Sequence, residues 1–118
     1  MERGLPTEDE RSEIEVKSRI ALATAAFNER KELLTKSIEL QLKKKIVKCL
    51  VWSVALYGCE TWTLRKEEIR RLNALEMWIW RRMMKISWKE KQTNENVLQS
   101  VEEKRSLMNT ITRRKKHW

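Results

Sequence analysis

The sequence has few residues that interrupt helices or cross-link a chain. Among its 118 residues are 2 glycines and 1 proline, a content that excludes collagen-like chains and Gly/Pro-rich disordered chains. Its 2 cysteines are too few for a miniprotein held together by disulfides. The longest stretch without a charged residue, residues 49–59, falls short of the roughly 18 apolar residues that a membrane-spanning helix needs. We therefore expect no membrane partner.

Side chains that carry catalysis are scarce as well. The chain has one aspartate, Asp9, and one histidine, His117. Two-metal phosphoryl transfer needs several convergent carboxylates, and a nucleophilic triad needs a positioned histidine. His117 is the next-to-last residue, where chains commonly fray. We therefore expect a protein that is not an enzyme and that holds no metal ion and no cofactor.

The cysteines and the N-terminal residues indicate a reducing compartment. Cys49 and Cys59 are ten positions apart, and the chain does not supply the further ligands of a zinc site. The first residues are acidic and lack the apolar run of a secretory signal. We expect an intracellular protein, nuclear or cytoplasmic and not secreted, in which both thiols are free and buried as small apolar side chains.

Positive charge is in excess and is unevenly distributed. The 26 Lys and Arg residues outnumber the 17 Asp and Glu residues, which gives a net charge of +9. Residues 1–15 hold six acidic and two basic residues, so the whole excess lies in the rest of the chain. Such an excess favours nucleic acid or another anionic surface as a partner, although solvated helix faces would also account for it.

Apolar residues recur at helical spacing along most of the chain. A first helix begins at a capping box, either Thr7 with Glu10 or Ser12 with Glu15, and ends near Asn28. A second helix is predicted over residues 38–57 and ends at Gly58. Its predicted apolar stripe is broad and consists of Ile38, Leu42, Ile46, Leu50 and Val54, joined by Val47 and Val51 at offset positions.

The C-terminal half continues the same pattern. A third helix is predicted from Lys66 to Lys85, with a core face of Ile69, Leu72, Leu75, Ile79 and Met83. Asn94 can cap a further segment, but periodicity leaves open whether residues 94–118 form one helix or two. The predicted fold is all-α, a small bundle of about four to five helices over residues 13–118. A poorly ordered acidic segment, residues 1–12, is expected to precede it.

Three stretches have unusual sequences: RIALATAAF at residues 19–27, LYGCETWTL at residues 56–64 and EMWIWRRMMKISW at residues 76–88. Together they resemble the thumb and post-palm region of reverse transcriptases from non-LTR retrotransposons of the RTE-like kind. TRRKKHW at residues 112–118 is similar to the start of an Arg-rich segment that continues further in that family.

The resemblance implies a thumb-like domain that contacts primer and template, RNA or DNA. Polymerase activity in that family depends on an upstream palm with a metal-binding Asp-Asp motif, which nothing here matches. We therefore expect a non-catalytic fragment, truncated at its C-terminal end, that binds nucleic acid without sequence preference. The alternative is a helical interaction remnant that needs a missing palm domain or a protein partner and has no function alone. The sequence does not distinguish a relic of a transposable element, a mispredicted reading frame and a retained host gene. It also does not indicate whether RNA or DNA is preferred.

The candidate nucleic-acid contacts are three groups of basic side chains and two tryptophans beside them. They are Lys43, Lys44, Lys45, Lys48, Arg81, Arg82, Arg113, Arg114, Lys115, Lys116, Trp80 and Trp118. The lysines could equally be a solvated helix face, and the terminal group a frayed tail or a nuclear-localisation patch. Trp78 and Trp80 point about 200° apart on a helix, so we expect Trp78 in the core and Trp80 exposed.

Overall fold

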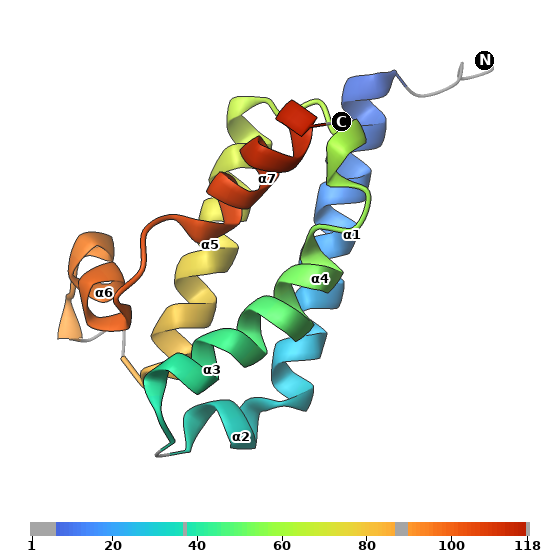
Figure 1. Ribbon diagram of the computed structural model, residues 1–118. Coiled ribbons are helices and arrows are strands. Elements are labelled where there is room, and N and C mark those ends of the chain that lie inside the picture. The colour runs from blue at the N-terminus through green and yellow to red at the C-terminus, as the bar shows by residue number, and fades with distance from the viewer. Residues whose placement is uncertain (1–6, 37, 87–89, 118) are drawn as a thin grey trace.

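Figure 1 shows the computed structural model, which describes residues 7–36, 38–86 and 90–117. The helices are α1 (Glu8–Glu29), α2 (Lys31–Thr35), α3 (Leu40–Ile46), α4 (Trp52–Ala55), α5 (Lys66–Met83), α6 (Asn94–Val101) and α7 (Ser106–His117). A wide helical turn, η1 (Val47–Val51), joins α3 to α4, and a 3₁₀ turn, η2 (Cys59–Thr61), follows α4. No strand occurs in these described ranges, so the prediction of a small all-α bundle is confirmed.

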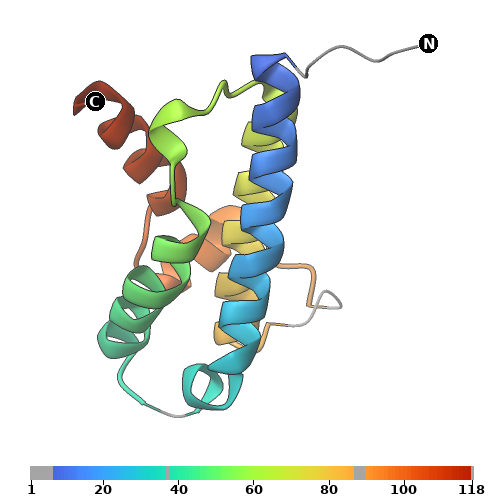
Figure 2. The same cartoon turned by 90° about the vertical axis from the view of Figure 1, so that its right-hand side faces the viewer.

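The core of the bundle is built by α1, α5 and the continuous helix from α3 to α4 (Figure 1). α1 runs antiparallel to α3–α4 and in the same direction as α5 (Figures 1 and 2). α6 packs against α5, and α7 lies across α5 and beside η2. Within the described part of the chain, no helix is both long and apolar enough to cross a membrane.

α1 begins inside the segment that we expected to be poorly ordered. The backbone N–H of Glu10 donates to the Thr7 hydroxyl at 3.1 Å, so the first of the two predicted capping boxes starts the helix. Ser12, the second candidate, is instead buried within α1, and its hydroxyl accepts from the backbone N–H of Thr63 at 2.8 Å. The predicted boundary at residue 12 is therefore wrong, because the cap and this contact fix residues 8–12 in the helix.

A wide turn lies in the middle of the helix from α3 to α4. The backbone N–H of Trp52 donates to the carbonyl of Val47, five residues earlier, so the turn holds one residue more than an α-helical turn. Val47, Val51 and Ala55 are buried, whereas Leu42 and Leu50 are 49% and 40% exposed. The predicted burial of Leu42 and Leu50 is therefore wrong, whereas that of Val47 and Val51 is confirmed. Ile46 and Val54, two other members of the predicted stripe, are partly buried and pack against the core.

The link between α4 and α5 turns sharply at Gly58. Its φ of +74° lies in the left-handed region, which favours glycine, as expected for a residue that ends a helix. Cys59 is buried directly after the turn, as predicted, but Cys49 on the wide turn is exposed, contrary to the prediction. Burial raises the pKa of the Cys59 thiol, and the nearby carboxylate of Glu60 adds to that effect.

α5 carries most of the predicted core face. Leu72, Leu75, Ile79 and Met83 are buried, and Ile69 is half-buried. Two glutamates of the same helix, Glu68 and Glu76, are also completely buried, which the apolar pattern does not predict.

The C-terminal segment forms two helices. Thr93, not Asn94, caps α6, because its hydroxyl accepts from the backbone N–H of Asn96 at 3.1 Å. Glu102 adopts a left-handed φ of +59° and ends the helix. The backbone N–H of Glu103 then donates to the carbonyl of Leu98 at 2.9 Å, a pairing that closes helix C-termini.

We predict that Gly58→Ala destabilises the bundle by about 1–2 kcal/mol, because a Cβ makes the left-handed conformation costly. No neighbouring atom lies within 4 Å of a Cβ built at this position, so the cost arises from the backbone alone. Urea denaturation measures the free energy of unfolding. Gly58→Asn is the matched control and should cost less, because asparagine tolerates this region. Equal losses in both variants would contradict the explanation.

We also predict that the two thiols react at different rates with a disulfide reagent such as DTNB. Cys49 is exposed, whereas Cys59 is buried and the raised pKa of its thiol reduces its thiolate fraction. Cys49 should be modified quickly and Cys59 only after denaturant is added. Cys49→Ser should remove the fast phase alone, and a fast phase that survives this substitution would contradict the assignment.

Candidate nucleic-acid interface

The position of α7 is set by a buried carboxylate on α5. Glu76 accepts hydrogen bonds from the backbone N–H groups of Ser106, at 2.9 Å, and Leu107, at 3.1 Å. It also accepts from the Ser106 hydroxyl at 3.3 Å and from the indole N–H of Trp80 at 3.0 Å. A carboxylate at a helix N-terminus satisfies backbone donors that have no partner within the helix. Glu76 therefore fixes where α7 starts.

α4 contacts Ser106, the first residue of α7, as well. The indole N–H of Trp52 donates to the Ser106 hydroxyl at 3.1 Å, and the Trp52 and Trp80 rings meet edge to face with centroids 5.5 Å apart. One network thus joins α4, α5 and the first residue of α7. It holds α4 and α7 at a fixed separation.

A groove of about 830 Å³ lies between these two helices, and we call it the α4–α7 groove. Four basic side chains line it, Lys48, Lys104, Arg113 and Arg114. Two acidic residues, Glu102 and Glu103, line it too, together with polar side chains of α7 such as Asn109 and Thr110.

The first group of predicted contacts mostly serves the fold. Lys43 and Lys44 are buried, and the Lys44 ammonium donates to the carbonyl of Glu102 at 2.9 Å. Glu103 lies 3.5 Å from Lys44 and also pairs with Lys48. Lys45 is exposed. The prediction of phosphate contacts for Lys43 and Lys44 is therefore corrected, because both side chains are buried and Lys44 holds α3 against the α6–α7 link.

Arg81 and Arg82 have different surroundings. Arg81 is buried, and its guanidinium donates to the carbonyl of Gln92 at 2.7 Å and to the side-chain oxygen of Asn94 at 3.1 Å. It therefore holds the segment that leads into α6, and its predicted role in binding nucleic acid is corrected. Arg82 is exposed, and its guanidinium lies 4.6 Å from the centre of the Trp78 ring.

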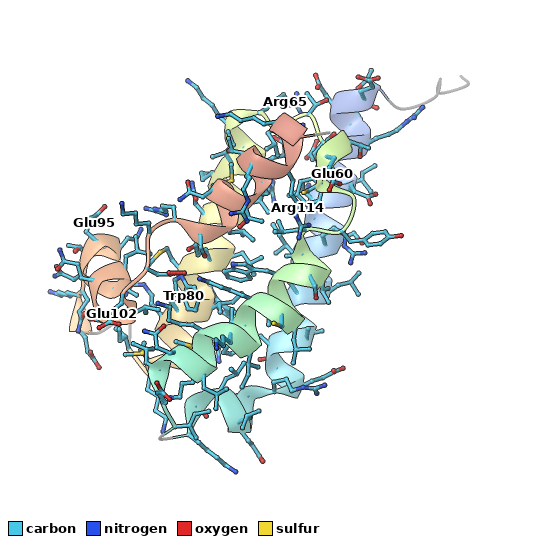
Figure 3. The ribbon with its side chains drawn as sticks, viewed as in Figure 1. Glu60, Arg65, Trp80, Glu95, Glu102 and Arg114 are labelled. Atoms are coloured by element: carbon cyan, nitrogen blue, oxygen red, sulfur yellow. The ribbon has the colours of Figure 1, made fainter. Side chains whose placement is uncertain are left out.

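The prediction that Trp80 is exposed and contacts nucleic acid is wrong, whereas Trp78 packs against the core, although only partly buried. Trp80 is completely buried and points into the interior between α5 and α3 (Figure 3). Trp78 is half-buried and meets the ring of Phe27 edge to face at 5.5 Å. The reason is the spacing of Glu76 and Trp80, one helical turn apart, which turns the indole N–H towards the buried carboxylate.

The terminal basic group remains at the surface. Arg113, Arg114, Lys115 and Lys116 are all exposed. Lys115 donates to the backbone carbonyls of Trp62, at 2.5 Å, and Glu60, at 3.4 Å, and so ties α7 to the α4–α5 link. Figure 3 shows Arg114 beside this link. Trp118, the predicted stacking residue, lies outside the described residues.

Arg113 and Arg114 both line the α4–α7 groove, and no carboxylate of the described residues forms an ion pair with them. Lys104, at the end of the same groove, is exposed and likewise carries no ion pair within the described ranges. Lys104 is missing from the predicted site, although its place after the last acidic residue of the chain, Glu103, was a usable signal. Glu76 gave no such signal, because its partners lie about 30 positions away.

The described residues contain no cluster of three or more His, Cys, Asp or Glu side chains that could hold a metal ion. No protein-family model matches the chain, and no curated protein and no solved structure matches it significantly.

We predict that Glu76→Gln lowers the free energy of unfolding by about 1.5–3 kcal/mol, the range for hydrogen bonds to a charged group. The amide also turns an NH₂ group towards the backbone donors of α7. Relative to the unchanged chain, the variant should show a larger increase in the hydrogen-exchange rate in α7 than in α1.

Glu68→Gln is the matched control, because Glu68 is also completely buried but its oxygens accept no hydrogen bond from the described residues. Its charged neighbour is Arg65, at 3.6 Å. This variant should leave exchange in α7 unchanged. Loss of α7 protection in both variants would contradict the role of Glu76.

Proposed function

We propose that this chain binds RNA or DNA without sequence preference and that the α4–α7 groove contacts the phosphate backbone. The observation that carries the proposal is the convergence of Lys104, Arg113 and Arg114 on one groove, with no acidic partner among the described residues. Unpaired cations on one surface attract a polyanion by releasing its counterions. The resemblance of residues 19–27, 56–64 and 76–88 to a reverse-transcriptase thumb region points to the same class of ligand.

The absence of sequence preference follows from what the groove offers to a base. Trp52 lines it but is buried, and its indole N–H is already bonded to Ser106. The backbone donors at the start of α7 are likewise bonded to Glu76. The groups left for a ligand are mainly flexible charged side chains, which bind phosphates and carry little sequence information, beside exposed amides such as that of Asn109.

The proposed role is to hold nucleic acid, not to copy it. It implies a non-catalytic remnant of a reverse transcriptase. Incorporation of nucleotides by the purified chain would contradict this part of the proposal.

We predict that the double variant Arg113→Glu/Arg114→Glu weakens binding of a labelled 20-nucleotide single strand and of a 20-base-pair duplex alike. Each lost phosphate contact should reduce the slope of log Kd against log salt by about 0.7 for the single strand and 0.9 for the duplex. Fluorescence anisotropy at several salt concentrations measures both quantities.

The matched control is Lys31→Glu/Lys36→Glu, which makes the same change in net charge on exposed residues at the α2 end of the bundle. It should reduce affinity far less and leave the salt slope nearly unchanged. Equal effects of the two double variants would show that net charge alone attracts the ligand. Binding of the unchanged chain that is independent of salt would overturn the proposal.

A further inference from the structure

The outer face of α1 and α5 is not covered by any helix of the described residues. In Figure 2, α3, α4 and α7 all lie to the left of α1 and α5, whereas the described part of the link between α5 and α6 extends to the right in the lower half of the view. A groove of about 460 Å³ runs between α1 and α5 on this bundle, and we call it the α1–α5 groove. Its apolar lining includes Ile20, Ala21, Ala74, Leu75 and Trp78.

The groove has the shape that a third helix requires. Ala21 on α1 and Ala74 on α5 are both exposed, and small side chains allow another helix to approach closely. Ile14 lies seven residues before Ala21, about two turns along the same face of α1, and is 63% exposed. The apolar strip therefore extends beyond the groove towards the start of α1.

Two guanidinium groups stand at the ends of this strip on α5. Arg71 and Arg82 are eleven residues apart, which places them on one face of the helix about 16 Å apart along its axis. Nε of Arg71 is buried and has no hydrogen-bond partner within the described residues, although Nη2 pairs with Glu67 at 3.3 Å. Arg82 contacts the Trp78 ring and forms no ion pair with a described carboxylate.

The remaining cations on this face are already paired. Arg70 pairs with Glu67 at 2.5 Å, and Lys17 pairs with Glu13 at 3.0 Å. These pairs lower the pKa values of both carboxyl groups, so Glu67 and Glu13 are ionised near neutral pH. Glu67 is shared by Arg70 and Arg71, and Arg82 has no ion pair with a described carboxylate, so the positive charges of this face outnumber the carboxylates that pair with them.

We propose that the α1–α5 groove docks an acidic amphipathic helix of a partner protein. The apolar face of that helix would cover Ala21, Ala74 and Trp78, and two carboxylates about three turns apart would meet Arg71 and Arg82. This is the helix-in-groove mode of recognition, with charge complementarity setting the orientation. The surface lies away from the α4–α7 groove and does not depend on the proposed binding of nucleic acid.

Two other occupants fit the groove less well. A nucleic acid would place phosphates over an apolar floor and leave that floor without an apolar partner. A second copy of the chain, related by a two-fold axis, would bring the same cation-rich face against itself and so oppose like charges.

The test uses the full chain and a designed probe. The probe is a fluorescent 21-residue helical peptide with leucine and alanine along one face and two glutamates eleven positions apart at its edges. Its matched control has lysine at those two positions. We expect the glutamate peptide to bind at least tenfold more tightly than the lysine peptide, as measured by fluorescence anisotropy.

Variants of the chain localise the site. Ala74→Arg fills the groove at an exposed position and should abolish binding of the glutamate peptide, whereas Leu42→Arg, at an exposed apolar position on α3, should not. Arg82→Glu should weaken binding of the glutamate peptide and strengthen binding of the lysine peptide. A variant that had lost its fold would not bind the lysine peptide more tightly. Circular dichroism checks that each variant retains its helices.

Several outcomes would overturn the proposal. Equal binding of the two peptides, or no binding of either, would show that the groove does not select an acidic helix. A dimer of the chain in analytical ultracentrifugation that Ala74→Arg dissociates would identify a second copy as the occupant. Binding of an oligonucleotide that Ala74→Arg abolishes would identify nucleic acid. Arg113→Glu/Arg114→Glu should bind the glutamate peptide normally, which separates this proposal from the proposed function.

Discussion

The contact of the buried Glu76 carboxylate with the start of α7 is the interaction on which this end of the bundle depends. A charge removed from water is costly unless hydrogen bonds compensate for it, and here four donors surround one carboxylate. The donors come from α5 and α7, and Ser106 also bonds Trp52 of α4. Because this network sets the direction of α7, it also sets where Arg113 and Arg114 reach the surface.

Local signals predicted the helices and the apolar core face of α5 well, but they did not predict every buried side chain. Thr7 and Gly58 act through their own backbone surroundings, so the start of α1 and the turn after α4 can be recognised from the sequence. The buried face of α3–α4 was predicted only in part, since Val47 and Val51 of the broad apolar stripe are buried while Leu42 and Leu50 are exposed. The burial of Glu76 and Trp80 depends on donors about 30 positions away.

The same distinction separates the correct from the incorrect parts of the candidate site. Lys44 and Arg81 have the composition of surface cations, but backbone carbonyls and carboxylates from later in the chain hold them in place. Arg113 and Arg114 follow the last acidic residue of the sequence, Glu103, and stay exposed. A basic cluster therefore predicts an exposed charged surface most reliably when no acidic residue that could pair with it follows later in the sequence.

The double pairing of Glu103 makes the α4–α7 groove electrically asymmetric. One carboxylate serves both Lys44 and Lys48, so an anion that reaches Lys48 competes with a group already in place. At the opposite end, on α7, an anion meets guanidinium groups without such a competitor among the described residues. In the proposed complex with nucleic acid, phosphates would therefore contact Arg113 and Arg114 more readily than Lys48.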